Sequence, residues 1–226
     1  MTHSVPVIAI DGPGGAGKGT VALLLARQMG WHLLDSGSLY RITAYAATAK
    51  GVDLQSSAEV AEVARNLPVT FKLDHQGVNI FLNGQDVTSI IRTEEGGRAA
   101  SIVAADPAVR DALITRQQAF AEAPGLVADG RDMGTVVFPS ARLKIFLTAS
   151  VEERARRRYK QLKDKGMDVS LPALSRDMEE RDMRDSERAV APLRAAADAR
   201  TLDSTNLSVA EVVTQVASWA AEIYAV

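Results

Sequence analysis

The chain of 226 residues can hold one domain with insertions or two small domains. Hydrophobic residues make up 46% of it and charged residues 24%, as in ordinary soluble globular proteins, and the net charge of -2 gives no reason to expect binding to nucleic acids or membranes. Because the chain has no cysteine, disulfides, thiolate zinc sites and cysteine nucleophiles are excluded.

A strand, a glycine-rich turn and a helix follow one another near the start of the chain. An apolar run over 6–11 predicts the strand, and residues 18–29 predict the helix, which Gly30 closes. A phosphate-binding P-loop requires this order, because glycines let successive backbone N–H groups face one anion at a helix N-terminus. The predicted ATP-binding residues are Gly12, Pro13, Gly14, Gly15, Ala16, Gly17, Lys18, Gly19 and Thr20.

Lys18 is the expected catalytic cation of this loop, because its ammonium group can reach the β- and γ-phosphates. The alternative, a flexible glycine-rich linker, is disfavoured since a strand and a helix flank the loop. Gly19 stands where most P-loops have serine or threonine, and Thr20 follows it. This form resembles the loop of nucleoside monophosphate kinases more than that of GTPases or motor ATPases.

The next segments alternate between strands and helices, with one change of pattern. Residues 69–73 alternate between apolar and polar side chains, the mostly apolar run 78–82 follows, and Asn83-Gly84 after it is a strong signal for a hairpin turn. We therefore predict a small antiparallel sheet inserted into the α/β array. Asp106 and Ser150 are expected to cap the helices that follow them. The other predicted helices cover 36–50, 57–65, 94–104, 107–121, 172–188 and 207–224, and the other strands 31–35, 126–129, 143–147 and 200–203.

Four segments together resemble the bacterial cytidylate (CMP) kinases. They cover residues 7–20, 34–41, 128–139 and 181–188, and the run from Asp129 to Thr135 is much more specific to that family than a P-loop alone. The antiparallel insertion at about 68–88 resembles the family's enlarged monophosphate-binding region. The resemblance covers nearly the whole chain. It implies transfer of the γ-phosphoryl group of ATP to CMP, and to dCMP, with Mg²⁺ as cofactor and ADP as co-product, in pyrimidine nucleotide metabolism.

The repeated strand–helix units predict a parallel, right-handed wound sheet with helices on both faces. With the resemblance, the predicted fold is an α/β P-loop kinase with a mostly parallel five-stranded core sheet, an inserted small antiparallel sheet and a short helical lid. We expect residues 1–226 to form a single kinase unit. Its parts are a core at about 5–35, 108–150 and 189–226, a monophosphate-binding region at about 36–107 and a lid at about 151–188.

Two segments that follow neighbouring strands are candidates for the acceptor site, because ligands collect at the carboxyl ends of strands in open α/β sheets. One contains Ser36, and the other contains Arg131 and Asp132. The position of Arg131 in a strand-end loop favours a functional role over a solvated surface charge. Planar guanidinium groups suit a phosphate monoester, and Arg41 and Arg188 are assigned to the same phosphate mainly by the resemblance.

The resemblance also implies how the nucleoside is bound. Asp132 would accept a hydrogen bond from cytosine N4, and Ser101 and Arg110 would donate toward N3 and O2. Uracil carries O4 in place of N4 and N3–H in place of N3, so an acceptor would face an acceptor and a donor would face a donor. Without the resemblance, we would interpret Ser101 as a small helix residue and Arg110 as a surface residue. Arg181 and Asp185 share one helix face and would hold the sugar, although an ordinary ion-pair ladder is the alternative on this charge-rich helix.

A run of basic residues follows Ser150, with few acidic residues among them. Such crowding costs stability unless an anion neutralises it, and in this fold the helix resembles a lid that closes over ATP. Arg154 and Arg158 are four residues apart, and we expect one or both of them to be catalytic as clamps on the transition state. The basic residues are Arg154, Arg156, Arg157, Arg158, Lys160 and Lys163.

Mg²⁺ is expected to accompany ATP, and no residue is assigned as its certain ligand. Thr20 and Asp129 are candidates for contact through water, and Asp129 has capping of the Gly130 turn as its alternative role. A general base is not required, because the acceptor phosphate oxygen is already ionised.

Other functions stay open at this point. A P-loop kinase for UMP, AMP or shikimate would share the fold, but the 129–132 segment and the hairpin insertion argue against it. A GTPase is disfavoured because no Asn-Lys-x-Asp segment is present, and a non-catalytic nucleotide-binding or nucleic-acid-binding protein is supported only by the basic helix. The expected partners are ATP and CMP or dCMP, with no nucleic acid and no membrane. Without a signal-peptide pattern or a transmembrane-length apolar run, we expect a cytoplasmic protein, and a monomer.

Overall fold

The computed structural model describes residues 5–73, 77–164 and 166–224. The chain divides into two compact units, one made of residues Met1–Leu34 and Phe120–Val226 and the other of residues Asp35–Ala119. We call them the P-loop unit and the helical unit. The predicted division into core, monophosphate-binding region and lid stays a prediction. Within the described residues, no helix has both the length and the apolar character needed to cross a membrane.

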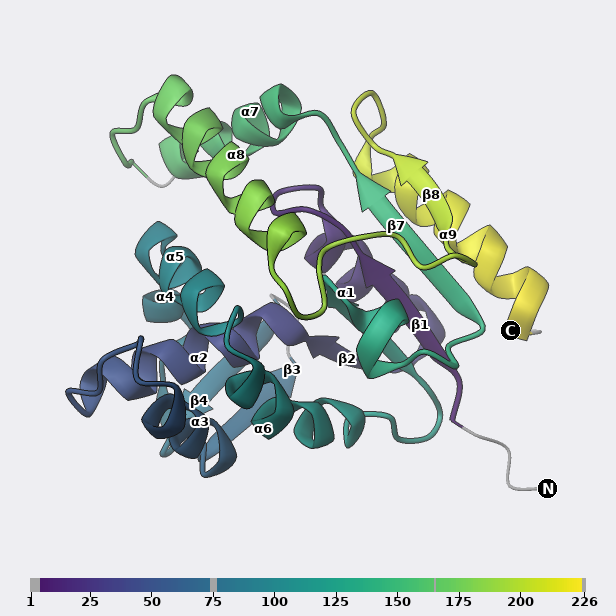
Figure 1. The fold of residues 1–226 in the computed structure, drawn as a ribbon. Coiled ribbons are helices and arrows are strands. Elements are labelled where there is room, and N and C mark those ends of the chain that lie inside the picture. Colours follow the sequence, from purple (N-terminus) through teal and green to yellow (C-terminus); the bar gives the residue numbers. More distant parts are fainter. Residues whose placement is uncertain (1–4, 74–76, 165, 225–226) are drawn as a thin grey trace. The chain divides into compact units, whose positions relative to one another are not determined.

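The P-loop unit is built on a five-stranded sheet in the order β2-β6-β1-β7-β8. Figure 1 shows β1, β7 and β8 side by side, and β1 pairs in parallel with β6 and β7, as β7 does with β8. The central strand β1 is buried along its whole length, as its apolar sequence requires of a strand covered on both faces. The strands are β1 Val7–Asp11, β2 His32–Asp35, β6 Leu126–Gly130, β7 Leu143–Thr148 and β8 Arg200–Asp203. The predicted parallel core sheet is confirmed.

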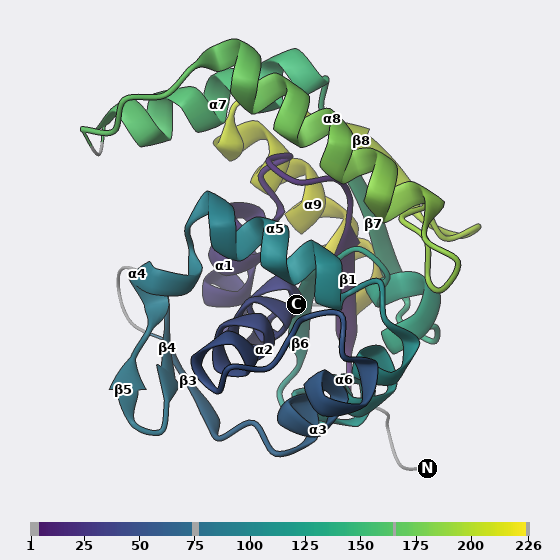
Figure 2. The ribbon, with the colours of Figure 1, turned by 60° about the vertical axis from the view of Figure 1, so that its left-hand side comes forward.

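Helices α1 Lys18–Met29 and α9 Val209–Tyr224 pack together against one face of this sheet. Every second residue of β1 points toward them, because side chains alternate along a strand. Helices α7 Val151–Asp164 and α8 Leu171–Glu187 form a separate pair, side by side in both ribbon views (Figures 1 and 2). The core under α1 and α9 includes Ile8, Ile10, Val21, Leu25, Val127, Ile145, Val212 and Val216.

The helical unit contains five helices and a three-stranded antiparallel sheet among its described residues. Helix α2 packs against α3 and α5, and α3 packs against α6. The sheet has the order β3, β4, β5 (Figure 2), and the turn between β4 and β5 is Asn83-Gly84, where both residues have positive φ, 49° and 80°. The predicted insertion and its hairpin turn are therefore confirmed. The elements are α2 Ser36–Ala49, α3 Ser57–Arg65, β3 Val69–Leu73, β4 Val78–Leu82, β5 Gln85–Asp86, α4 Thr88–Ile91, α5 Glu94–Val103 and α6 Pro107–Gln118.

Several element ends differ from the predicted ones for local reasons. The last helix begins at Val209 rather than at Leu207, because Ser208 and Glu211 hydrogen-bond each other's backbone N–H groups in a capping box. Asp106 caps α6 as predicted, accepting from the N–H groups of Ala108 and Val109. Three elements are not predicted at all: β5, α4 and η1, a single π-helical turn over Met133–Val137.

Candidate active site

The P-loop follows β1 directly and ends in the first turn of α1. Gly17 occupies the N-cap of α1 with φ of 95°, a left-handed conformation that favours glycine. No side chain among the described residues caps this helix. The N–H groups of the first turn are therefore available for an anion, and the positive end of the helix dipole adds to their attraction.

Lys18 lies folded into this loop. Its side chain is buried, and its Nζ donates a hydrogen bond of 2.9 Å to the carbonyl oxygen of Pro13. Burial and the neighbouring charge of Arg131 lower the pKa of Lys18 to about 7, and the carboxylate of Asp129 opposes that shift. A polyphosphate would offer the ammonium group a stronger partner than a carbonyl does.

Two guanidinium groups flank the P-loop at Gly14. A Cβ built on Gly14 would lie 3.4 Å from Nη2 of Arg131 and 3.8 Å from Nη1 of Arg181. Nε of Arg131 donates to Oδ2 of Asp185 at 2.8 Å. Burial alone would raise the pKa of Asp185, but Arg131 and Arg181 hold it below its usual value. The structure thus brings together Lys18 and three of the residues predicted to bind CMP.

Asp132 and Arg188 lie close to each other in the same unit. Asp132 is the N-cap of η1 and is 2% exposed, and its Oδ1 lies 3.9 Å from Nη2 of Arg188. Arg188 is the residue that follows the last turn of α8, and its Nε donates to the carbonyl oxygen of Ala191. A buried carboxylate with a guanidinium beside it offers both an acceptor for an amino group and a cation for a phosphate.

Sequence reasoning missed Asp11, which supports this region from the end of β1. Its carboxylate accepts hydrogen bonds from the backbone N–H groups of Met133 and Gly134 at 2.7 and 2.8 Å. Burial raises the pKa of Asp11 to about 6, although these two hydrogen bonds oppose the shift. The carboxylate joins the strand that leads into the P-loop to the turn that follows Asp132. An acidic residue at the end of a fully buried strand is the signal that could have identified it.

The arginines at the start of α7 have protein partners, and carboxylates of the chain itself offset the charge of three of them. Arg154 is 3% exposed and donates to the carbonyl oxygens of Ala149 and Gly14 and to Oδ2 of Asp182, at 3.0, 2.9 and 2.5 Å. Arg156 and Arg157 both pair with Glu153, one turn before them. Nη1 of Arg158 donates to Gln161 at 3.3 Å. Arg154 therefore holds the P-loop backbone, and Asp182, which sequence reasoning missed, holds Arg154.

The remaining candidates lie in the helical unit. Arg41 donates to the carbonyl oxygens of Ile91 and Thr93, at 2.8 and 2.9 Å, and Ser36 donates to Gln117 at 2.7 Å. Arg110 is buried against the ring of Tyr40 and donates to the carbonyl oxygen of Ala104, one turn after Ser101 on α5. The alternative interpretation, in which Arg110 is a surface residue, is therefore wrong. Ser101 is also buried.

The metal-site candidates surround Gly19. A Cβ on Gly19 would lie 3.3 Å from Oδ2 of Asp129, so the missing side chain leaves space beside this carboxylate, next to the exposed Thr20. Oxygen ligands suit Mg²⁺, which keeps several waters when it is bound with a nucleotide. In the described part of the chain, no group of three or more His, Asp or Glu residues could hold a metal ion by itself. The residues fit an ion held mainly by the phosphates.

Binding of ATP should take up a proton above neutral pH. Lys18, whose pKa is about 7, is charged below that pH and largely neutral at about pH 8, and the phosphates of ATP would raise its pKa again. The affinity for ATP should therefore fall as the pH rises from about 7 to 9, by up to about tenfold per unit. Calorimetric titration with ATP in buffers of different ionisation enthalpy measures the proton uptake.

The control for this prediction is Lys18→Arg, because arginine stays charged throughout this pH range. The variant should bind ATP with little proton uptake at about pH 8. Equal uptake by both proteins would show that another group carries the proton.

Comparisons with known proteins find similarity along nearly the whole chain. A family model described as cytidylate kinase matches residues 8–222. The chain is 63% identical to the cytidylate kinase of Pseudomonas paraeruginosa (strain DSM 24068 / PA7) over 94% of both chains. It is 56% identical to that of Aeromonas salmonicida (strain A449) over 97% of this chain and 96% of the relative. A solved shikimate kinase from Bacteroides thetaiotaomicron is similar over 98% of this chain and 99% of that chain, at 12% identity and a TM-score of 0.48, too low to carry a conclusion.

Proposed function

Because the chain belongs to the cytidylate kinase family, we propose that it transfers the γ-phosphoryl group of ATP to CMP, with CDP and ADP as products. The observation that carries this proposal is the similarity to curated cytidylate kinases along nearly the whole chain. The cations at the P-loop agree with it, since phosphoryl transfer depends mainly on positioning and on positive charge around the phosphates. We extend the proposal to dCMP as a second acceptor.

The donor phosphates are assigned to the P-loop. Its N–H groups at the start of α1 would hold the β-phosphate, and Lys18 would exchange its hydrogen bond to Pro13 for the phosphate oxygens. A bound Mg²⁺ would neutralise part of the phosphate charge. Asp129 and Thr20 are the residues that would hold it, through water, in the space beside Gly19.

The residues assigned to the acceptor fall into three groups, according to the part of CMP that each would bind. We assign its phosphate to Ser36, Arg41, Arg131 and Arg188, its base to Ser101, Arg110 and Asp132, and its sugar to Arg181 and Asp185. The position of Arg131 beside Gly14 supports its assignment, because the acceptor phosphate must approach the donor end of the P-loop.

Arg154 and Arg158 are proposed to stabilise the charge of the transferring phosphoryl group. Arg154 reaches the P-loop already, at the carbonyl oxygen of Gly14, so a clamp at this position would exchange that carbonyl for a phosphate oxygen. The cytoplasmic location and the monomeric state stay predictions.

The decisive test is ATP-dependent diphosphate formation from CMP, dCMP, UMP and AMP at equal concentration. CMP should be phosphorylated fastest. In Asp132→Ala the ratio of kcat/KM for CMP over UMP should fall by about a hundredfold or more, because the buried acceptor for N4 is lost. Asp198→Ala is the control, since Asp198 is an exposed carboxylate paired with Lys144.

The other outcomes each point to one alternative. A preference of the unmodified protein for UMP or AMP would keep the donor site and overturn the acceptor assignment. Binding of ATP without turnover of any acceptor would favour a nucleotide-binding protein without catalysis. An unchanged CMP preference in Asp132→Ala would remove this residue from the base site.

A further inference from the structure

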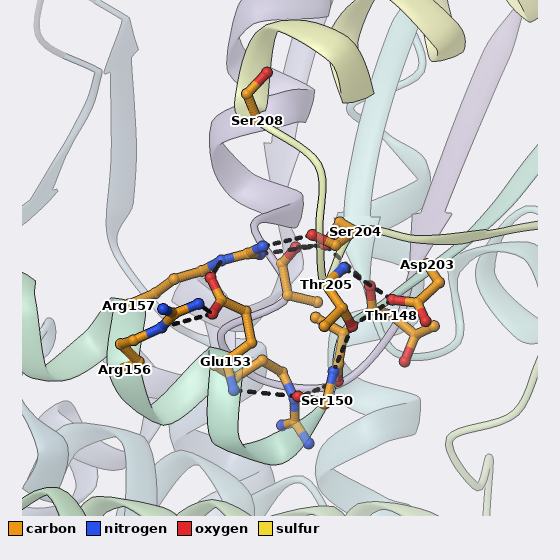
Figure 3. A network of polar contacts seen from close by, with 12 residues as sticks. Thr148, Ser150, Glu153, Arg156, Arg157, Asp203, Ser204, Thr205 and Ser208 are labelled. Carbon is orange, nitrogen blue, oxygen red and sulfur yellow. Dashed lines mark hydrogen bonds and ion pairs between the residues drawn. The ribbon is translucent and has the colours of Figure 1, made fainter.

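Ser204 connects the turn after β8 with the P-loop. Its side chain is 2% exposed and lies in the polar network of Figure 3. Its hydroxyl oxygen lies 3.0 Å from the carbonyl oxygen of Thr148 and 3.3 Å from that of Ala16, in the P-loop. Its backbone N–H also donates to Thr148, at 2.8 Å. Ser204 is thus fixed to the end of β7 while its hydroxyl faces the phosphate-binding loop.

Arg157 sets the direction of this hydroxyl. Nη1 of Arg157 donates to Oγ of Ser204 at 3.2 Å, and Nη2 donates to the backbone oxygen of the same residue at 2.5 Å. A hydroxyl has one proton, and its oxygen accepts from Arg157, so the proton faces the carbonyl oxygens of Thr148, at 3.0 Å, and Ala16, at 3.3 Å, which share it. Nε of Arg157 is held by Glu153 at 2.8 Å, which completes the alignment of the guanidinium group.

The carbonyl group of Ala16 controls the direction of an N–H group of the loop. The structure records a cis peptide bond at Ala123–Pro124 and not between Ala16 and Gly17, so the latter bond is trans. In a trans peptide the C=O and the following N–H point in opposite directions. Ser204 holds the oxygen of Ala16 from outside the loop, so the N–H of Gly17 points away from Ser204. Gly17 has φ of 95° and no side chain, so its own conformation does little to restrain this peptide group.

We propose that Ser204 and Arg157 are positioning residues of the ATP site. Ser204 fixes the peptide between Ala16 and Gly17 so that its N–H faces the phosphates, and Arg157 fixes Ser204. Neither residue needs to touch ATP for this role. The inference rests on the proposed function, in which ATP is the anion that the loop binds.

The test compares two variants with two matched controls. Ser204→Ala removes the hydroxyl, and Arg157→Lys keeps the charge beside Glu153 but loses the two-pronged contact with Ser204. The control Ser208→Ala changes a serine of the same turn that lies apart from the network in Figure 3 and bonds Glu211 instead. The control Arg156→Lys changes a residue that shares Glu153 but is exposed.

The Kd for ATP should rise about five- to tenfold in Ser204→Ala and in Arg157→Lys, as expected for the loss of one oriented hydrogen bond. The Kd for CMP should stay within about twofold, and both controls should bind ATP normally. The Kd of the double variant for ATP should equal that of the single variant that binds ATP less tightly, because both changes act on one contact. Calorimetry measures both ligands, and circular dichroism shows that each variant is folded.

The inference fails if ATP binding is unchanged in both variants, if the controls lose as much affinity, or if the two effects add in the double variant. An unfolded Ser204→Ala protein leaves Arg157→Lys to decide, since that change removes no buried hydroxyl. The proposed function is tested separately by turnover. ATP affinity that responds to Ser204→Ala in a protein without CMP turnover would overturn the function and keep the positioning role.

Discussion

Lys18→Met should lower kcat for CMP phosphorylation by about 10²- to 10³-fold, the loss typical of removing one charged group that stabilises the transition state. Methionine keeps an unbranched stem of similar length, so packing in the buried pocket beside Pro13 is retained while the charge is lost. The effect should exceed the change in KM, because charge on the transferring phosphoryl group develops in the transition state. Steady-state kinetics with ATP and CMP varied in turn separates the two.

Lys144→Met is the matched control for this prediction. Lys144 is another buried lysine of the P-loop unit, and its Nζ pairs with the exposed carboxylate of Asp198 at 2.9 Å. Its removal leaves Asp198 in contact with solvent, so kcat should stay near that of the unmodified protein. If Lys144→Met loses as much activity as Lys18→Met, or if Lys18→Met keeps kcat within a few-fold, the catalytic role of Lys18 is contradicted.

Local patterns predict most of the elements in this chain, because the relevant signals lie within one turn of each end. Helix α1 occupies the predicted bounds, Lys18–Met29, since Gly17 and Gly30 on either side have positive φ and end the helix. The inserted sheet follows from a two-residue alternation and from Asn83-Gly84, whose conformations suit a tight hairpin.

The unpredicted turn η1 depends on a partner far away in the sequence. The segment Met133–Val137 contains glycine and β-branched residues and has no helix signal of its own. Its first N–H groups are instead bound by Asp11, which lies 122 residues before Met133. No periodicity within the segment could show this contact.

The functional site, like the fold, can be predicted only in part from the sequence. The residue types around the P-loop are readable from the sequence, since glycines, Lys18 and strand-end arginines follow from the chemistry of phosphate binding. The contacts of Arg154 are not, because it bonds Gly14, 140 residues away, and Asp182, 28 residues away. A count of basic residues on α7 therefore identifies a cationic helix but not which arginine supports the loop. The same holds for Ser204, a serine in a polar turn without any motif.

Gly12→Ala should destabilise the P-loop unit by about 3 kcal/mol or more, a large part of the stability of an ordinary domain. Gly12 has φ of 148°, and a Cβ there would lie 1.9 Å from the backbone oxygen of Leu147 on β7. That oxygen belongs to a strand paired on both sides, so it cannot move without breaking the sheet. Urea unfolding followed by circular dichroism should show a lower midpoint.

Gly51→Ala is the control that separates the cost of a steric clash from the cost of a positive φ. Gly51 also has a positive φ, 73°, but a Cβ there would meet nothing within 4 Å, so its replacement should cost only about 1 to 2 kcal/mol. The difference between the two variants then measures how tightly the start of the P-loop is pressed against β7. Equal losses would show that the loop can move away from Leu147, and the N–H groups that follow Gly12 would not be rigidly placed for the phosphates.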